Sequence, residues 1–503
     1  MADNIVLYAL VHQPRRIRLP ALPLPRTASA AELEEGIFDE SLNRFYFQKV
    51  ARTCYYPMTD LLPELLDRGL RLNLGFSMSF IHQALLWDRA LLDRFRALVR
   101  HPGIELVCVE PYHSFIFYMD IVRFMERVAL ARDTLADLFG ERPTSVEVTE
   151  MFMSREIYLA LDRLGFRGTL MEGRHRVLGD RAPTHLYHQG RNLALFARHK
   201  DLSDDVGYRF TQVTWPGYPL KASDYVGWVK HTPGDFVFVG WDFETFGEHH
   251  RLDSGIFDFV RWLPGEFNWQ GVQMLTMSEA LDRFRPSARE IALPVVPTSW
   301  AGLNGEPEFF FGSPAQFKIF LLMHHAYHVA RLTGDPQLID IALWLCQSDN
   351  LHLLGWSGGA DSSEAEVSSY FTPGYWWNFG AERIPGELAA VYEGFIAAAA
   401  ERLKDQGLPA NEERDAHKTR TVEFRFYDPQ AKHVALVGDL TGWSKDPVLL
   451  VSDGHGYWKA TIGLAPGRYE YKFLVDGEWR SDPNCRLSVP DGFGALNNVV
   501  TVE

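Results

Sequence analysis

The period of the hydrophobic pattern changes once along this chain, and the change divides it into two parts. Up to about residue 405, apolar runs of strand length alternate with helical patterns such as Arg123–Leu138 and Ser154–Leu164. From about residue 420, apolar and polar residues alternate singly, as in Thr421–Tyr427 and Tyr469–Val475. The first pattern predicts parallel strands with crossover helices, and the second predicts half-buried antiparallel strands. We therefore expect two differently built parts.

The first part has the pattern of an α/β fold. Its strand-like runs are followed by helical segments, and at this length a (β/α) barrel is favoured over an open sheet. We expect the barrel to span residues 1–313 and a mostly helical region, residues 314–405, to pack on it. The runs that we interpret as strands include Ile5–Val11, Leu72–Phe76, Ile104–Val109 and Phe236–Gly240.

The second part is predicted to be a small antiparallel β-sandwich. A polar stretch with Gly407 and Pro409, residues 406–419, is typical of a linker. In residues 420–503, short strands alternate with turn signals such as Asp453-Gly454 and Asp476-Gly477. Several short strands at this spacing are typical of one sandwich domain.

Charge and cysteine content narrow the functional classes. The chain of 503 residues has 50 Lys+Arg against 65 Asp+Glu, a net charge of −15 that disfavours binding to phosphate backbones. An uncharged apolar stretch of about 18 residues, which a membrane span needs, is missing. The four cysteines are scattered and form no C-x-x-C pair, which fits a reducing compartment. We expect a cytoplasmic protein with no nucleic-acid or membrane partner; nothing in the pattern sets an oligomeric state.

Polar side chains follow several of the predicted strands. His12 comes directly after the first strand, and Glu110 and His113 come after the run Ile104–Val109. Glu150 ends the alternating segment SVEVTEM. Barrel enzymes carry their reactive groups just beyond the carboxyl ends of the strands, so these residues are candidates for a shared site.

Two more acidic residues follow the apolar run that ends at Gly240. In an extended segment residues two apart share a face, so Asp242 and Glu244 are both candidates to point into a cleft. Taken singly, each acidic residue is explained as a solvated or capping group, and Glu150 as a cap for the helix that begins near Ser154. Acidic groups at several strand ends favour a functional site, because glycoside hydrolysis needs two carboxyl groups held at a fixed separation.

A metal site is not indicated. His249 and His250 are adjacent and cannot share a helix or strand face, so the interpretation as surface residues is favoured. The two-carboxylate chemistry needs no metal or organic cofactor.

Four segments with polar ends follow one another along the chain: LYALVHQP (7–14), VCVEPYHS (107–114), VEVTEMF (146–152) and WDFETFGEH (241–249). Two shorter segments, Ser299-Trp300-Ala301 and Gln347-Ser348-Asp349, come after them. In this order the segments resemble the motifs of glycoside hydrolase family 57, in particular its α-amylase branch, and the resemblance covers about residues 1–400.

The resemblance implies an incomplete seven-stranded (β/α) barrel and a retaining mechanism through a covalent glycosyl-enzyme. By motif, Glu150 would be the nucleophile and Asp242 the general acid/base. The residues that would bind sugar hydroxyls or tune this pair are His12, Glu110, His113, Glu244 and Asp349.

The C-terminal segment contains the motifs VALVGDLTGW (434–443), YEYKFLVDGEW (469–479) and GALNNV (494–499). Together they resemble carbohydrate-binding module family 48, the glycogen-binding type. The resemblance implies that Trp443 and Trp479 stack on glucose rings and that Lys472 and Asn497 bind hydroxyls. Each Trp follows a polar turn, which favours exposure over core packing.

Together these features predict an α-amylase-like enzyme that cleaves α-1,4 linkages of an α-glucan polysaccharide (glycogen or starch) or a maltooligosaccharide. Alternatives are a 4-α-glucanotransferase and an amylopullulanase-like enzyme. A non-catalytic glycogen-binding protein is the alternative from another class, and the presence of both Glu150 and Asp242 argues against it.

Overall fold

The computed structural model describes residues 1–302, 305–355, 382–405, 420–441, 443, 447–454, 456–464, 467–485, 487–491 and 495–502. The chain forms two compact units, Met1–Leu408 and Pro409–Glu503. The predicted linker, residues 406–419, lies outside the described residues. The predicted boundary between barrel and helical region at residues 313/314 stays a prediction.

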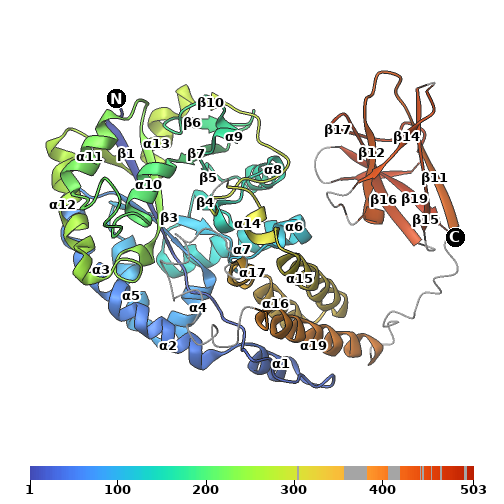
Figure 1. The fold of residues 1–503 in the computed structure, drawn as a ribbon, viewed down its shortest axis with the longest axis horizontal. Helices are drawn as coiled ribbons and strands as arrows, with labels where there is room; N and C mark the ends of the chain where they lie inside the picture. Colours follow the sequence, from blue (N-terminus) through green and yellow to red (C-terminus); the bar gives the residue numbers. More distant parts are fainter. Residues whose placement is uncertain are drawn as a thin grey trace. The chain divides into compact units, whose positions relative to one another are not determined.

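A curled sheet with seven parallel strands forms the centre of the N-terminal unit (Figure 1), in the order β7-β5-β4-β3-β2-β1-β8. On its flanks, β6 (Leu186–His188) pairs antiparallel with β7, β10 (Arg289–Glu290) pairs with β6, and β9 (Gln273–Leu275) pairs with β1. The expected incomplete barrel with seven strands is confirmed. The seven strands are β1 (Asn4–Val11), β2 (Leu72–Phe76), β3 (Ile104–Val109), β4 (Ser145–Glu147), β5 (Gly168–Glu172), β7 (Ala194–Arg198) and β8 (Val237–Asp242).

The two ends of this strand series meet at β7 and β8. The backbone N–H of His199 donates to the carbonyl of Phe238 at 2.8 Å. The Nε of Arg198 donates to the carbonyl of Gly240 at 2.9 Å. A side chain therefore replaces part of the regular ladder at this seam, and the carboxyl ends of β7 and β8 lie side by side.

β1 is buried on both of its faces, which explains why it appears in the sequence as a continuous apolar run. Along β1, the side chains of Val6 and Tyr8 belong to a core cluster on one face of the sheet. The alternate residues Ile5 and Leu7 belong to the large core cluster on the other face. With both faces buried, β1 does not show the polar alternation of a half-exposed strand.

Helices surround the sheet, and their caps follow the sequence signals. Ser154 caps α8 by accepting a hydrogen bond from the N–H of Ile157 at 3.3 Å, so Glu150 is not needed as that cap. Within the part of the chain that the structure describes, none of the helices has the length and apolarity of a bilayer span. The helices are α1 (Ala30–Ile37), α2 (Glu40–Val50), α3 (Tyr56–Asp67), α4 (Met78–Trp87), α5 (Arg89–Val99), α6 (Ile116–Met119), α7 (Ile121–Phe139), α8 (Arg155–Arg163), α9 (His175–Leu178), α10 (Lys200–Gly207), α11 (Ala222–His231), α12 (Ile256–Trp269), α13 (Met277–Phe284) and α14 (Glu308–Phe311).

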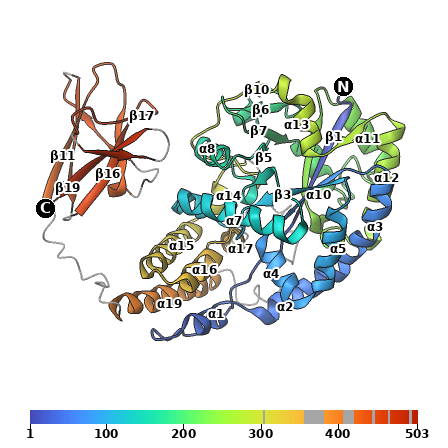
Figure 2. The same ribbon diagram turned by 180° about the vertical axis from the view of Figure 1, so that it is seen from behind.

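A layer of helices follows the sheet in the described part of residues 314–405. Its long helices α15 and α19 pack against each other, as both views show (Figures 1 and 2). Tyr392 of α19 donates to the carbonyl of Leu345 in α16 at 2.6 Å, so α16 is tied to the same layer. The members are α15 (Pro314–Thr333), α16 (Pro336–Leu345), α17 (Asp349–Gly355) and α19 (Ile384–Asp405).

The C-terminal unit contains two antiparallel sheets, which confirms the predicted β-sandwich. Phe424 and Phe426 of one sheet pack on Tyr471 and Phe473 of the other, with ring centroids 4.9 Å apart in both pairs. One sheet has the order β11 (Arg420–Tyr427), β15 (Tyr457–Leu464), β14 (Val451–Ser452). The other has the order β13 (Val448–Leu449), β12 (Val434–Gly438), β16 (Gly467–Val475), β19 (Leu496–Val502), β18 (Ser488–Pro490), with β17 (Glu478–Arg480) on β16.

Candidate active site

Glu150 lies just beyond the carboxyl end of β4, in a short 3-10 turn (Thr149–Met151). Its φ of 56° is in the left-handed region, which non-glycine residues rarely adopt and which is often found at functional sites. The carbonyl of Glu150 accepts hydrogen bonds from Ser299 Oγ at 2.8 Å and from the N–H of Trp300 at 3.3 Å. These contacts hold the strained backbone and fix the direction of the side chain.

Both carboxylate oxygens of Glu150 accept hydrogen bonds. Trp300 Nε1 donates to Oε2 at 2.7 Å, and Ser348 Oγ donates to Oε1 at 3.0 Å. His113 Nδ1 lies 3.9 Å from Oε1. The side chain is 14% exposed, so it is mostly enclosed but still reachable. Donors aimed at both oxygens favour the ionised carboxylate.

Asp242 ends β8, opposite Leu10 of the neighbouring strand β1. Burial raises the pKa of Asp242 to about 7, the negative charge of Glu150 adds to the rise, and the positive charges of His12 and Arg198 oppose it. Both residues lie at the carboxyl ends of strands in one sheet, and the charge of Glu150 acts on Asp242. Near pH 7 a part of the Asp242 carboxyl groups is protonated, while the donors aimed at both oxygens of Glu150 favour its ionised form.

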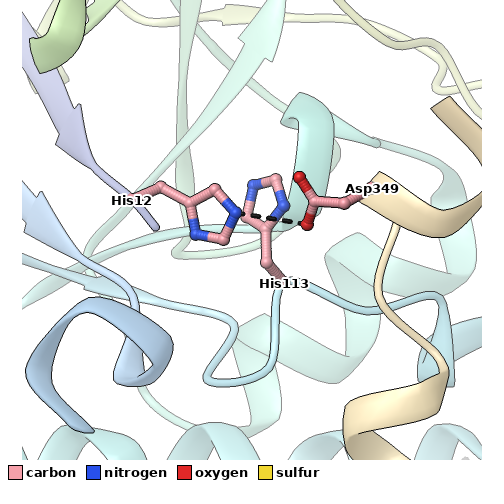
Figure 3. Close-up of side chains that lie close together, drawn as sticks. All are labelled: His12, His113 and Asp349. Carbon is pink, nitrogen blue, oxygen red and sulfur yellow. Dashed lines mark hydrogen bonds and ion pairs between the residues drawn. The ribbon is translucent and has the colours of Figure 1, made fainter. Parts of the chain in front are cut away.

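His12, His113 and Asp349 form a cluster beside this pair (Figure 3). His12 Nε2 lies 3.3 Å from Asp349 Oδ2, and the two imidazole rings stack with centroids 4.2 Å apart. Burial alone would raise the pKa of Asp349, but the charge and hydrogen bond of His12 lower it to about 2. Burial, aided by the charge of His12, lowers the pKa of His113 to about 3. Asp349 is thus a permanent anion and His113 a neutral hydrogen-bonding group.

The same cluster is the candidate for a metal site among the described residues, since its ligand-type atoms all lie within 4.8 Å of one another. Its geometry suits an ion pair better. The rings of His12 and His113 stack with planes 25° apart, and His12 Nε2 already has Asp349 Oδ2 as a partner at 3.3 Å. His12 is also fixed at its other nitrogen, where Nδ1 lies 2.9 Å from Ser77 Oγ.

Glu244 lies in a 3-10 turn (Phe243–Thr245) and is buried, so the expectation that it follows Asp242 in an extended segment is wrong. The turn forms because the chain bends immediately after β8. Its carboxylate accepts hydrogen bonds from Tyr55 Oη and from the N–H of His12 at 3.3 Å. Burial and then the charge of Asp242 raise its pKa well above the usual range.

Glu110 is also fully buried. It accepts hydrogen bonds from the N–H of Ser114 at 2.6 Å and from Thr149 Oγ1 at 3.2 Å, and burial raises its pKa to about 7. Thr149 precedes Glu150, so Glu110 supports the turn that carries the candidate nucleophile. For both Glu110 and Glu244, the protein contacts support the role of tuning the pair over that of binding a sugar hydroxyl.

Glu147 also belongs to this site, although it was not among the candidates predicted from the sequence. It is fully buried on β4, Tyr8 Oη donates to its Oε2, and Oε1 has no hydrogen-bond partner among the described residues. Burial raises the pKa of Glu147 to about 8, opposed by the Tyr8 hydrogen bond and aided by Asp242 and Glu150. Its signal was the alternation Val146-Glu147-Val148, which points Glu147 away from its apolar neighbours and toward the other face of the sheet.

His250, the second residue of the adjacent histidine pair, is buried and not exposed as predicted. His250 is 1% exposed, so the interpretation as a surface residue is wrong. Its Nε2 lies 2.8 Å from the carbonyl of Val206, and its Nδ1 lies 3.2 Å from Thr211 Oγ1. His250 thus satisfies backbone groups at the end of α10, a structural role.

The sequence of the N-terminal unit matches one family model. Residues 6–294, more than half of the chain, match the model described as "Glycosyl hydrolase family 57". The chain belongs to glycosyl hydrolase family 57. This membership makes it an enzyme of the glycosidase type.

Relatives of this family 57 enzyme agree in sequence and in fold. A protein of Methanocaldococcus jannaschii named "Putative alpha-amylase" is 30% identical over 372 residues, covering 72% of this chain and 79% of the relative. The GH57-type branching enzyme from Pyrococcus horikoshii has a TM-score of 0.54 at 16% identity, covering 74% of this chain and 88% of that one. The 4-alpha-glucanotransferase from Thermococcus litoralis also has a TM-score of 0.54, at 14% identity, covering 94% and 65%. At these identities the two structures are similar in fold.

In the C-terminal unit of the family 57 enzyme, the predicted stacking residues are exposed. Trp443 is 41% and Trp479 is 50% exposed, whereas Lys472 and Asn497 are largely buried. Lys472 forms an ion pair with Asp491, and Asn497 Nδ2 donates to Glu470 Oε2 at 3.1 Å. The indole N–H of Trp443 is fixed on Asp439 Oδ1 at 2.7 Å.

This unit matches a second family model. Residues 421–503 match the model described as "Glycogen recognition site of AMP-activated protein kinase". The beta-1 subunit of the 5'-AMP-activated protein kinase of Sus scrofa is 35% identical over 96 residues, 19% of this chain and 74% of the relative. The family 57 enzyme therefore carries a glycogen-recognition module at its C-terminal end.

Proposed function

We propose that this family 57 enzyme is a retaining, α-amylase-like hydrolase of α-1,4 linkages in glycogen, starch or maltodextrin. The observation that carries the proposal is the unequal pair of carboxyl groups at one site. Glu150 accepts hydrogen bonds on both oxygens, while burial and the charge of Glu150 raise the pKa of Asp242 to about 7. Such a pair can supply a nucleophile and an acid at the same pH.

In the first step, a Glu150 carboxylate oxygen attacks the anomeric carbon while the bond from that carbon to the leaving oxygen breaks. The proton of Asp242 passes to the leaving oxygen, and Glu150 becomes a glycosyl ester. Because the ester is neutral, the charge that helped to raise the pKa of Asp242 disappears. Asp242 is then a base. It takes a proton from water as the water oxygen attacks the anomeric carbon, and the Glu150 carboxylate is restored.

The neighbouring polar groups have separate roles in this scheme. We assign contacts with sugar hydroxyls to His12, His113 and Asp349, which lie beside the pair and offer acceptors and donors. Glu110 and Glu244 are buried and accept hydrogen bonds from protein groups. We assign to them the role of tuning the pKa values of Glu150 and Asp242.

The C-terminal module supplies polymer binding. Trp443 and Trp479 present exposed indoles on which glucose rings can stack. We assign hydroxyl contacts to Lys472 and Asn497, whose polar ends are held in place by Asp491 and Glu470. A tethered second site raises the effective concentration of polymer near the catalytic unit without adding catalytic contacts. The four cysteines are free thiols, which supports a cytoplasmic location.

Incubation with maltoheptaose tests the proposed activity. Hydrolysis releases new reducing ends and shorter chains, and this is the expected result. Redistribution of chain lengths without new reducing ends would assign the enzyme as a 4-α-glucanotransferase instead. No change in either quantity, with glycogen binding retained, would leave a binding protein and overturn the proposal.

A further inference from the structure

Helix α12 exposes two tryptophans on one face. Trp269 is 87% exposed and Trp262 is 60% exposed. Residues seven apart in a helix lie on the same face, about 10 Å apart along its axis. Among the described residues, neither indole stacks on another aromatic ring. Large indoles that fill no core position and share one face point to a ligand.

The gap between the two rings is lined by a glycine and an arginine. Gly265 lies three residues after Trp262 on this face and is exposed. A Cβ atom placed on it would lie 3.3 Å from Nη2 of Arg68. Arg68 is anchored through Nη1, which donates to the carbonyl of Arg261 at 3.3 Å and to Glu64 Oε1 at 3.4 Å. Because a guanidinium has five N–H donors, the Nη2 side still offers donors at the gap.

The charges around this face are of both signs. Arg261 forms an ion pair with Asp258 at 2.7 Å, and Arg68 pairs with Glu64 at 3.4 Å. Glu266, between the two tryptophans, accepts a hydrogen bond from Gln270 Nε2 at 3.5 Å. The face therefore lacks the cluster of one sign that would attract a strongly charged partner. Charged groups and a glycine also separate the two indoles, so the face lacks the continuous apolar centre typical of a protein–protein interface. The complementary ligand is neutral, rich in hydroxyl groups and flat on one side.

We propose that Trp262, Trp269 and Arg68 form a second carbohydrate-binding surface, on the outer side of the catalytic unit, that takes a linear α-glucan chain. The two indoles stack on the apolar faces of two sugar rings in one chain. Arg68 donates hydrogen bonds to hydroxyls between them. Helix α12 contacts α3, α11 and β9 on the outside of the sheet, so this surface is separate from the carboxylates at the strand ends. The choice of glucan as the ligand rests on the proposed function.

Affinity electrophoresis in a glycogen-containing gel tests this surface. The background is the full chain with Trp443→Ala, Trp479→Ala and Glu150→Gln, which removes module binding and turnover. In this background Trp262→Ala with Trp269→Ala should weaken glycogen binding by about tenfold, while Trp262→Phe with Trp269→Phe should retain most of it. Arg68→Gln should weaken binding less than the double alanine variant.

The matched control is Trp228→Ala on α11. Trp228 is 38% exposed, but its ring packs edge-on against Trp215 with centroids 6.0 Å apart. This variant should lower the melting temperature without changing mobility in glycogen. Unchanged glycogen binding in the Trp262/Trp269 alanine variant would overturn the proposed surface. So would a dimer in solution that this variant converts to monomers, because the face would then bind a second copy.

The two proposals fail separately. If the otherwise unmodified enzyme cleaves maltoheptaose and the Trp262/Trp269 alanine pair leaves glycogen binding intact, only the surface is wrong. If that pair abolishes glycogen binding in the background while unmodified enzyme never turns over maltoheptaose, only the proposed hydrolytic activity is wrong.

Discussion

Trp300 donates its indole N–H to Glu150 Oε2 at 2.7 Å, across 150 residues of sequence. The tryptophan is itself held, because Arg174 donates to its carbonyl at 3.1 Å and the buried Arg198 guanidinium lies 5.6 Å from its ring centroid. The loop after β10 thus fixes a carboxylate oxygen of the candidate nucleophile.

Replacing Trp300 with phenylalanine keeps an aromatic ring but removes this donor. A hydrogen bond to a charged group contributes about 1.5–3 kcal/mol, so kcat on maltoheptaose should fall by about 10- to 100-fold. KM should change little, because the bond orients Glu150 and not the substrate. Steady-state kinetics check this, and a rise in KM at unchanged kcat would instead make Trp300 a substrate-binding residue.

The pH dependence of the first chemical step should follow Asp242. Its raised pKa of about 7 means that the acid form is present below pH 7 and is lost above it. The value of kcat/KM for maltoheptaose should therefore decline as the pH rises through about 7.

A substrate with an activated leaving group, such as a nitrophenyl maltooligoside, gives the control. Its departure needs no proton, so the alkaline decline in kcat/KM should weaken or vanish. An identical decline for both substrates would assign that titration to another group.

Glu147 should make stability depend on pH. Its folded pKa, about 8, lies above the ordinary value of 4.5. The folded state therefore keeps a proton that the unfolded chain releases. This stabilisation is fully present below about pH 4.5 and is lost as the pH rises through about 8. Glu147→Gln imitates the protonated form at every pH.

The melting temperature of Glu147→Gln relative to the unmodified enzyme should therefore rise between pH 5 and pH 9, since a pKa unit corresponds to about 1.4 kcal/mol. Glu141→Gln, at an exposed position, provides the control and should show no such trend. A constant difference for Glu147→Gln would show that Glu147 is ionised in the folded enzyme throughout.

The C-terminal module should strengthen binding to polymeric glucan and should not affect the catalytic steps. Trp443→Ala with Trp479→Ala should weaken binding to glycogen by about tenfold or more while leaving turnover of short maltodextrins near its original value. Glycogen affinity and kcat on maltotetraose check this. Equal losses in both would make the two tryptophans structural residues.

The sequence was most informative where local physics sets the structure. β1 was recognisable because a strand buried on both faces is an uninterrupted apolar run, and β3 because only Glu105 interrupts its apolar run. α8 was recognisable because Ser154 is a strong N-cap. Glu150 and Asp242 follow strands that share one sheet, so their convergence at one end was predictable.

The side chains that contact Glu150 could not be predicted from the sequence. The indole N–H of Trp300 and the hydroxyl of Ser348 reach Glu150 from loops that only the tertiary fold brings near. The conformation at Glu244 was wrongly predicted to be extended, because the chain turns into a 3-10 helix directly after β8. The burial of His250 was not predicted because it depends on Val206 in α10, 44 residues earlier in the chain.

The central claim is that Glu150 forms a covalent bond with the sugar while Asp242 moves the proton. Asp242→Asn, incubated with a 5-fluoro maltosyl fluoride, should accumulate the glycosyl-enzyme, because the good leaving group needs no acid and the second step lacks its base. Peptide mass spectrometry should then find one maltosyl group on the peptide that contains Glu150. Label on a different carboxylate, or turnover of the fluoride by Glu150→Gln at the unmodified rate, would contradict the account.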